Sequence, residues 1–214
     1  MARTFKDILD SSLTKKLREV YQSSWTDLCD LEIECGDSTI VPANKLLMLL
    51  RSEYFAALFR QEPDTKKVSL PQFDSELVKM IVKSTIDVEK NELEQVDLVE
   101  LLRASDFLQM PELTTIVSMI LSENVFHENA IELCELTQMI QAPELEKACI
   151  YKIKDDMYQY FEEGALDNFS SEYLKKLFTK PWSPRFDDFG RQLGVMETTE
   201  ILLSILFKTM KVSN

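Results

Sequence analysis

Glycine is scarce in this sequence. Only four of the 214 residues are glycine, namely Gly36, Gly164, Gly190 and Gly194. Loops that hold phosphate groups need glycine where the backbone approaches the ligand closely. Neither a GxGxxG nor a GxxxxGK[ST] pattern occurs. The sequence therefore excludes nucleotide chemistry of the usual kinds.

Cysteine and histidine are also few, and their spacing is wrong for a zinc site. No CxxC pair exists, and the four cysteines are Cys29, Cys35, Cys134 and Cys149. With a single histidine, a zinc site built from Cys and His would need an unusual arrangement. We therefore expect reduced thiols in or near the core, no metal and no cofactor.

The one histidine, His127, stands before Glu128 and Asn129 at a predicted helix start. A lone histidine without a neighbouring nucleophile is usually a surface or capping residue. The sequence also lacks a nucleophile–base set, so we expect no catalytic residue. An enzyme with a site hidden in a helical fold is the third and weakest hypothesis.

Long apolar runs and positive charge are lacking too. No run of 18 apolar residues occurs, and the first residues hold no apolar core for a secretory signal, so we expect an intracellular protein of the cytoplasm, the nucleus or both. The net charge is −13. Such a field repels phosphate backbones, so we expect no nucleic-acid partner and no membrane partner. A basic protein partner would suit this acidic surface.

Against these absences, residues 31–35 carry a clear strand signal. Leu31, Ile33 and Cys35 alternate with two glutamates, which is the period of a half-buried strand. A Gly-Asp turn follows, and residues 38–41 return as a second strand that Pro42 closes. The segment predicts a β-hairpin.

Two short helices are predicted next. Residues 43–50 are apolar nearly all round, which predicts a buried helix. Ser52 is a good N-cap for a second helix over residues 53–60, with Glu53 in its first turn. Two helices joined by a cap explain both the apolar run over residues 41–59 and its interruption at residues 51–54.

The rest of the chain predicts one more strand region and then helices. Residues 67–71 read as a strand, 74–86 as a helix capped by Asp74 or Ser75, and 85–89 as a possible edge strand. Further predicted helices cover residues 5–21, 96–110, 111–125, 127–140, 142–161, 170–178 and 197–210. We therefore expect an α+β front part and an all-α extension.

Residues 28–59, LCDLEIECGDSTIVPANKLLMLLRSEYFAALF, resemble the BTB (POZ) domain. The match includes Pro42-Ala43-Asn44-Lys45, where the family usually has histidine in place of Asn44, and Tyr54-Phe55 in the second helix. Residues 122–153 resemble the helical BACK extension of kelch-like adaptors. The resemblance implies a small mixed sheet flanked by helices over residues 1–122, followed by a BACK-like helical region over 123–214.

The resemblance also implies a homodimer and its interface. In the family an N-terminal helix packs across the partner copy. The implied interface residues are Leu9, Leu13, Leu17, Tyr21, Asp30, Asn44, Lys45 and Arg51. We expect Lys45 and Arg51 to be the basic partners of Asp30.

Many members of the family link a protein substrate to a cullin scaffold of a ubiquitin ligase. Cullin-binding members carry a hydrophobic-x-Glu motif after the second helix. Glu62 stands at the position of the glutamate of this motif. Arg60 stands where the hydrophobic residue is expected, and Phe59 is the nearest apolar residue that could replace it. The first hypothesis is thus a dimeric cullin adaptor, with Phe59, Arg60 and Glu62 as its contact.

The second hypothesis is a BTB-derived protein that binds no cullin. It would act as a scaffold, as a regulator that heterodimerises with full adaptors, or as a co-repressor platform. Arg60 favours it, as does the lack of a kelch or MATH repeat in these 214 residues.

Overall fold

The computed structural model describes residues 19, 25–86, 89–93 and 95–165. The described residues divide into two compact units. One unit contains the residues up to Asn124 together with Ile140–Glu144, and the other contains Val125–Met139 and the residues from Leu145 on. The predicted boundary between residues 122 and 123 stays a prediction.

The first unit is built on a three-stranded mixed sheet with the order β2-β1-β3. The strands are β1 (Leu31–Cys35), β2 (Ile40–Ala43) and β3 (Lys67–Leu70). β1 pairs antiparallel with β2, with Ile33 opposite Val41, and parallel with β3, with Ile33 opposite Val68. The predicted hairpin and third strand are confirmed. Pro42, however, lies inside β2 and does not close it.

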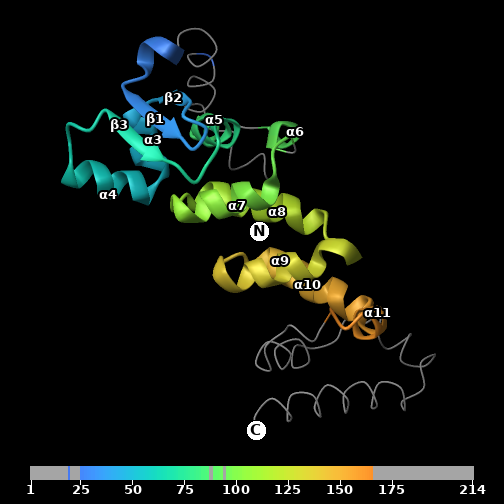
Figure 1. Cartoon of the computed structure of the whole chain (residues 1–214). Coiled ribbons are helices and arrows are strands. Elements are labelled where there is room, and N and C mark those ends of the chain that lie inside the picture. The colour runs from blue at the N-terminus through green and yellow to red at the C-terminus, as the bar shows by residue number, and fades with distance from the viewer. Residues whose placement is uncertain (1–18, 20–24, 87–88, 94, 166–214) are drawn as a thin grey trace. The chain divides into compact units, whose positions relative to one another are not determined.

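Helices connect and cover these strands, as Figure 1 shows. The parallel β1–β3 pair needs a crossover connection, and after β2 the chain supplies α3 (Lys45–Arg51) and α4 (Glu53–Gln61), which pack on each other. α5 (Ser75–Ser84) contacts β1, β2 and α7 (Leu98–Phe107), and α7 packs on α8 (Pro111–Glu123). The short α6 (Lys90–Leu93) joins α5 to α7. This is the predicted α+β architecture.

Local chemistry explains where several helices begin. Asp74 accepts a hydrogen bond from the Leu77 amide at 2.8 Å and caps α5. Asp97 caps α7 in the same way, and Pro111 stands in the first turn of α8, where its missing N–H costs nothing. Residues 85 and 86 form a turn after α5, so the possible edge strand does not begin there.

The first unit leaves no room for a side chain at Gly36. Its amide donates to the Phe73 carbonyl at 2.7 Å, and a Cβ atom there would lie 2.3 Å from the Pro71 carbonyl oxygen. The neighbouring Asp37 accepts hydrogen bonds from the Ser75 and Thr39 amides. The hairpin turn is therefore fixed against the start of α5.

The second unit is helical. It contains α9 (His127–Met139), most of α10 (Pro143–Asp155) and α11 (Met157–Glu162). The predicted single helix over 142–161 is wrong, because a turn at Asp156 divides it into α10 and α11. The thiols of Cys35, Cys134 and Cys149 are reduced and buried, and the thiol of Cys29 is half-buried. The helices predicted at 5–21, 170–178 and 197–210 lie outside the described residues, apart from residue 19.

Candidate interaction surface

The helix α3 is held by polar contacts at both of its ends. Its N-cap is Asn44, whose Oδ1 accepts from the Leu47 amide at 3.1 Å while its Nδ2 donates to the Leu28 carbonyl at 2.6 Å. Ser52 donates its amide to the Met48 carbonyl at 3.0 Å and thereby ends the helix. The same Ser52 caps α4 with its hydroxyl oxygen, as predicted. Both helices are thus fixed at one shared residue.

One face of α3 is apolar and open to solvent. Leu46, Leu49 and Leu50 expose 61%, 37% and 64% of their surface. Their spacing of three and four residues puts them on one side of the helix. Met48, on the other side, is fully buried. We call Leu46, Leu49 and Leu50 the leucine face. Contiguous exposed apolar patches mark interaction sites, whereas apolar side chains that are exposed singly are ordinary.

The leucine face corrects one prediction. Residues 43–50 were expected to be buried because they are apolar nearly all round, yet only the Met48 side of the helix reaches the core. A helix of two turns that lies on a sheet and a second helix has one side to bury. Its surplus of leucine was the signal in the sequence that pointed to a second, external surface.

The predicted interface residues near α3 are placed within hydrogen-bond reach of it. Asp30 Oδ1 accepts from the backbone amide of Lys45 at 2.8 Å. The Lys45 ammonium group donates instead to the Thr65 carbonyl at 3.0 Å and to the Pro63 carbonyl. Arg51 Nε donates to the Thr85 carbonyl at 3.3 Å. The expected Asp30–Lys45 and Asp30–Arg51 side-chain pairs are therefore not formed.

These contacts give the four side chains a positioning role inside the chain. Asp30 and Asn44 satisfy amides and a carbonyl at the start of α3, and Lys45 and Arg51 tie the helix to carbonyls of later segments. Their part in a dimer interface stays a prediction. The other predicted interface residues, Leu9, Leu13, Leu17 and Tyr21, lie outside the described residues.

The three residues predicted to touch a cullin differ in exposure. Phe59 is only 5% exposed, and its ring lies 5.7 Å from that of Phe55 and 4.7 Å from the Lys45 ammonium group. A side chain this buried offers a partner little surface, and the predicted cullin contact of Phe59 stays a prediction. Arg60 and Glu62 are exposed at the end of α4, and Glu62 accepts from the Thr65 hydroxyl at 3.1 Å.

The turn that leads into β2 contains a strongly perturbed carboxyl group. Hydrogen bonds from Ser75 and from Thr39 lower the pKa of Asp37 to about 2. The carboxylate is thereby kept charged far into the acid range. In the described ranges, no three His, Cys, Asp or Glu side chains gather as metal ligands, and no helix there has the length and apolarity needed to cross a bilayer.

Comparison with known proteins identifies the part of the chain that carries this surface. The BTB/POZ domain family matches residues 19–125, which is half of the 214 residues. The chain belongs to the BTB/POZ family. BTB domains are protein–protein interaction modules that commonly homodimerise and are generally not enzymes. The leucine face lies inside the BTB domain.

Two solved structures are similar to the chain. The BTB domain of human gigaxonin has 19% sequence identity and a TM-score of 0.39, and the match covers 50% of this chain and 92% of that one. The BTB domain of zebrafish PATZ1 has 19% identity and a TM-score of 0.41, with 57% of this chain and 98% of that one covered. No curated protein matches the sequence.

Proposed function

We propose that this protein is a scaffold that homodimerises through the leucine face of its BTB domain and presents the rest of the chain to other proteins. The observation that carries the proposal is the exposure of Leu46, Leu49 and Leu50 on a helix that is otherwise firmly anchored. Burying apolar surface is the main favourable contribution to association.

A twofold dimer suits this surface because of its chemistry. In a twofold interface the same patch meets itself, so the patch must be self-complementary. Two copies of a chain with a net charge of −13 repel each other. The leucine face holds no charge, and α3 has no acidic residue in its sequence KLLMLLR. An apolar contact on this helix therefore brings no carboxylate of α3 into the interface.

The test is to place two charges on the leucine face. The double substitution Leu46→Glu, Leu50→Glu should weaken self-association at least about thirtyfold, which corresponds to the loss of about 2 kcal/mol at an interface hot spot. Analytical ultracentrifugation of the full chain, across a range of concentrations, measures the dissociation constant directly. Circular dichroism checks that the variant is still folded.

A matched control is available outside the BTB domain. Met139, in α9, is 72% exposed, so Met139→Glu places a single glutamate at a similarly open apolar position, and its matched partner on the leucine face is the single variant Leu50→Glu. This control should leave the dimer unchanged. A wild-type protein that sediments as a monomer at micromolar concentration would refute the proposal, and so would equal dimerisation of the double variant.

A cullin adaptor is the second candidate function, supported by the exposure of Glu62 at the place of the acidic residue in the family motif. Because Phe59 is in the core, the end of α4 presents Arg60 where cullin-binding members carry a hydrophobic side chain. We propose that this charge prevents or weakens the contact. The protein then acts as a scaffold, a heterodimerising regulator or a co-repressor platform.

Restoring the motif separates the two candidates. Calorimetry would measure binding of the full chain to the N-terminal region of a cullin, for the wild type and for Arg60→Leu. Binding by Arg60→Leu alone supports a BTB scaffold that has lost the contact. Micromolar binding by the wild type that disappears with Glu62→Ala supports the adaptor.

The residues after the BTB domain are the region where a further partner would bind. We propose that they form a BACK-like extension, on the basis of the resemblance over residues 122–153 and of the successive helices α9 and α10. A truncated chain that ends near Asn124 should still dimerise, if it is folded, but should lose binding to partners of the extension.

A further inference from the structure

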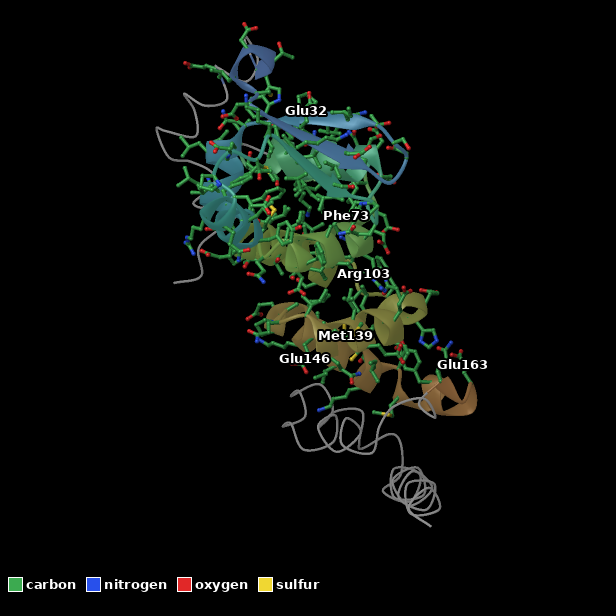
Figure 2. All side chains as sticks on the ribbon, turned by 60° about the vertical axis from the view of Figure 1, so that its left-hand side comes forward. Glu32, Phe73, Arg103, Met139, Glu146 and Glu163 are labelled. Carbon is green, nitrogen blue, oxygen red and sulfur yellow. The ribbon has the colours of Figure 1, made fainter. Side chains whose placement is uncertain are left out.

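The second unit contains a polar cluster around the only histidine of the chain. His127 begins α9, Asp156 lies in the turn between α10 and α11, and Glu163 follows α11. The imidazole Nδ1 lies 3.1 Å from Asp156 Oδ2, and Nε2 lies 3.1 Å from Glu163 Oε2. Figure 2 labels Glu163 beside the ribbon of α11. The His127 ring thus contacts two residues that are distant in the sequence, because Asp156 follows it by 29 positions and Glu163 by 36.

An aromatic ring supports the imidazole from one side. The ring of Tyr160, in α11, stacks on that of His127 with their centroids 4.1 Å apart and their planes inclined by 17°. The Tyr160 hydroxyl donates to the His127 carbonyl at 2.6 Å, and the tyrosine is buried. A cation over the face of a tyrosine ring is attracted by it. The stack therefore favours the protonated histidine.

Protonation decides how many of these contacts His127 can make. The imidazolium ion has two N–H donors, one for each carboxylate. A neutral imidazole has one donor and one lone pair, so one of the two carboxylates would face a lone pair. We propose that His127 is a pH-sensitive latch that, when protonated, holds the α10–α11 turn and the end of α11 against the start of α9.

The other charged groups around the cluster are compatible with this role. Lys152, in α10, donates to the same Asp156 oxygen at 2.9 Å. That hydrogen bond raises the pKa of Lys152, so the lysine stays positively charged while His127 titrates. Glu128, beside His127 in α9, acts electrostatically on Lys152 and Tyr160. Gln159 Nε2 donates to Glu163 at 2.9 Å. The carboxylates bind different ring nitrogens, so their oxygens do not converge as metal ligands would.

The directions of the pKa shifts set the pH window. Burial lowers the pKa of His127, but the hydrogen bonds to Glu163 and Asp156 outweigh it and leave the pKa above its ordinary value of 6.5. Hydrogen bonds from Gln159 and His127 lower the pKa of Glu163. The latch is therefore fully closed below pH 6.5, opens as the pH rises through the raised pKa, and is also lost when strong acid protonates Glu163.

A titration of the wild-type full chain tests the first requirement. Because His127 is the only histidine, its Hε1 proton gives a single NMR signal that needs no assignment by mutation. The midpoint should lie above 6.5. A midpoint at or below 6.5 would overturn the proposal.

Hydrogen exchange tests whether the latch holds α11. The amides to follow are those of Tyr160 and Glu163, which donate to the Asp156 and Gln159 carbonyls. Their protection factors, corrected for the intrinsic rate at each pH, should fall between pH 6 and pH 8.5, because the hydrogen bonds that raise the pKa of His127 stabilise this unit only while the ring is protonated. Amides of α8, in the other unit, should show no such change.

Two variants separate the latch from a merely structural contact. His127→Gln should show the same protection at both pH values, close to that of the wild type at pH 8.5. Tyr160→Phe removes the hydroxyl but keeps the ring, so it should lower protection at both pH values and preserve the pH dependence. A pH dependence that persists in His127→Gln, or is absent from the wild type, would overturn the proposal.

Discussion

Two apolar helices of the BTB domain, α8 and α3, differ in how much of their apolar surface is exposed to solvent. The helix α8 buries Leu113, Ile116, Val117, Ile120 and Leu121, whereas α3 buries only Met48. The helix α8 lies against α7, which gives its apolar side chains a wide surface to pack on. The comparison teaches that the composition of a helix sets how much apolar surface it has, while the neighbours available in the fold decide how much of that surface is covered.

The largest expected effect separates the two helices directly. Leu113→Ala in α8 should lower the free energy of unfolding by about 2–5 kcal/mol, because it leaves a cavity in a filled core. Leu50→Ala in α3 should change the stability of the isolated chain by less than about 0.5 kcal/mol. Urea denaturation at several protein concentrations measures both. The comparison fails if the two substitutions cost the same at the lowest concentration.

A middle-sized effect concerns how α3 is held while its leucines face solvent. Asn44→Ala should cost about 1 kcal/mol of stability, since it removes the N-cap of α3. Asn44→Ser keeps an oxygen that can accept from the Leu47 amide and should recover most of the loss. Thermal unfolding followed by circular dichroism measures the series. Equal losses for both variants would mean that the bond to the Leu28 carbonyl, and not the cap, matters more.

The smallest expected effect lies in the hairpin that precedes α3. The pKa of Asp37 is lowered to about 2 from 3.8 by hydrogen bonds from Ser75 and Thr39. Its stabilising contribution is therefore complete above pH 3.8 and is lost as the pH falls through about 2. Asp37→Asn should reduce stability slightly at pH 6 and make the acid unfolding curve shallower. Urea midpoints at pH 6 and pH 3 test this, with the exposed Asp64→Asn as control.

Much of the fold was predictable because it depends on short-range chemistry. The alternation over residues 31–35 and the cap at Ser52 are properties of a few neighbouring residues, and the structure confirms both. The cap of the later helix was left open between Asp74 and Ser75, and the structure assigns it to Asp74. The resemblance over residues 28–59 supplied the arrangement of these parts.

The features that escaped prediction depend on contacts between distant segments. The exposure of the leucine face depends on how few elements cover α3, and the burial of Phe59 depends on the packing of Phe55 and Lys45 around it. The cluster at His127 includes Asp156 and Glu163, which lie 29 and 36 positions further along the sequence, so neither periodicity nor motif spacing reveals it. A helix boundary such as the turn at Asp156 likewise left no proline or glycine in the sequence to mark it.

The position of Pro42 has a consequence for how copies of this protein can meet. Cys35 donates to the Thr39 carbonyl, so hydrogen-bonded pairs alternate along the hairpin and the Glu32–Pro42 pair falls between them. The N–H that proline lacks would have pointed away from β1, toward the outer edge of β2. A foreign strand added there would lose a hydrogen bond in the middle of its ladder, so this edge resists growth into an extended aggregate. The backbone at this edge of β2 thus offers a poor template for the unspecific addition of a strand.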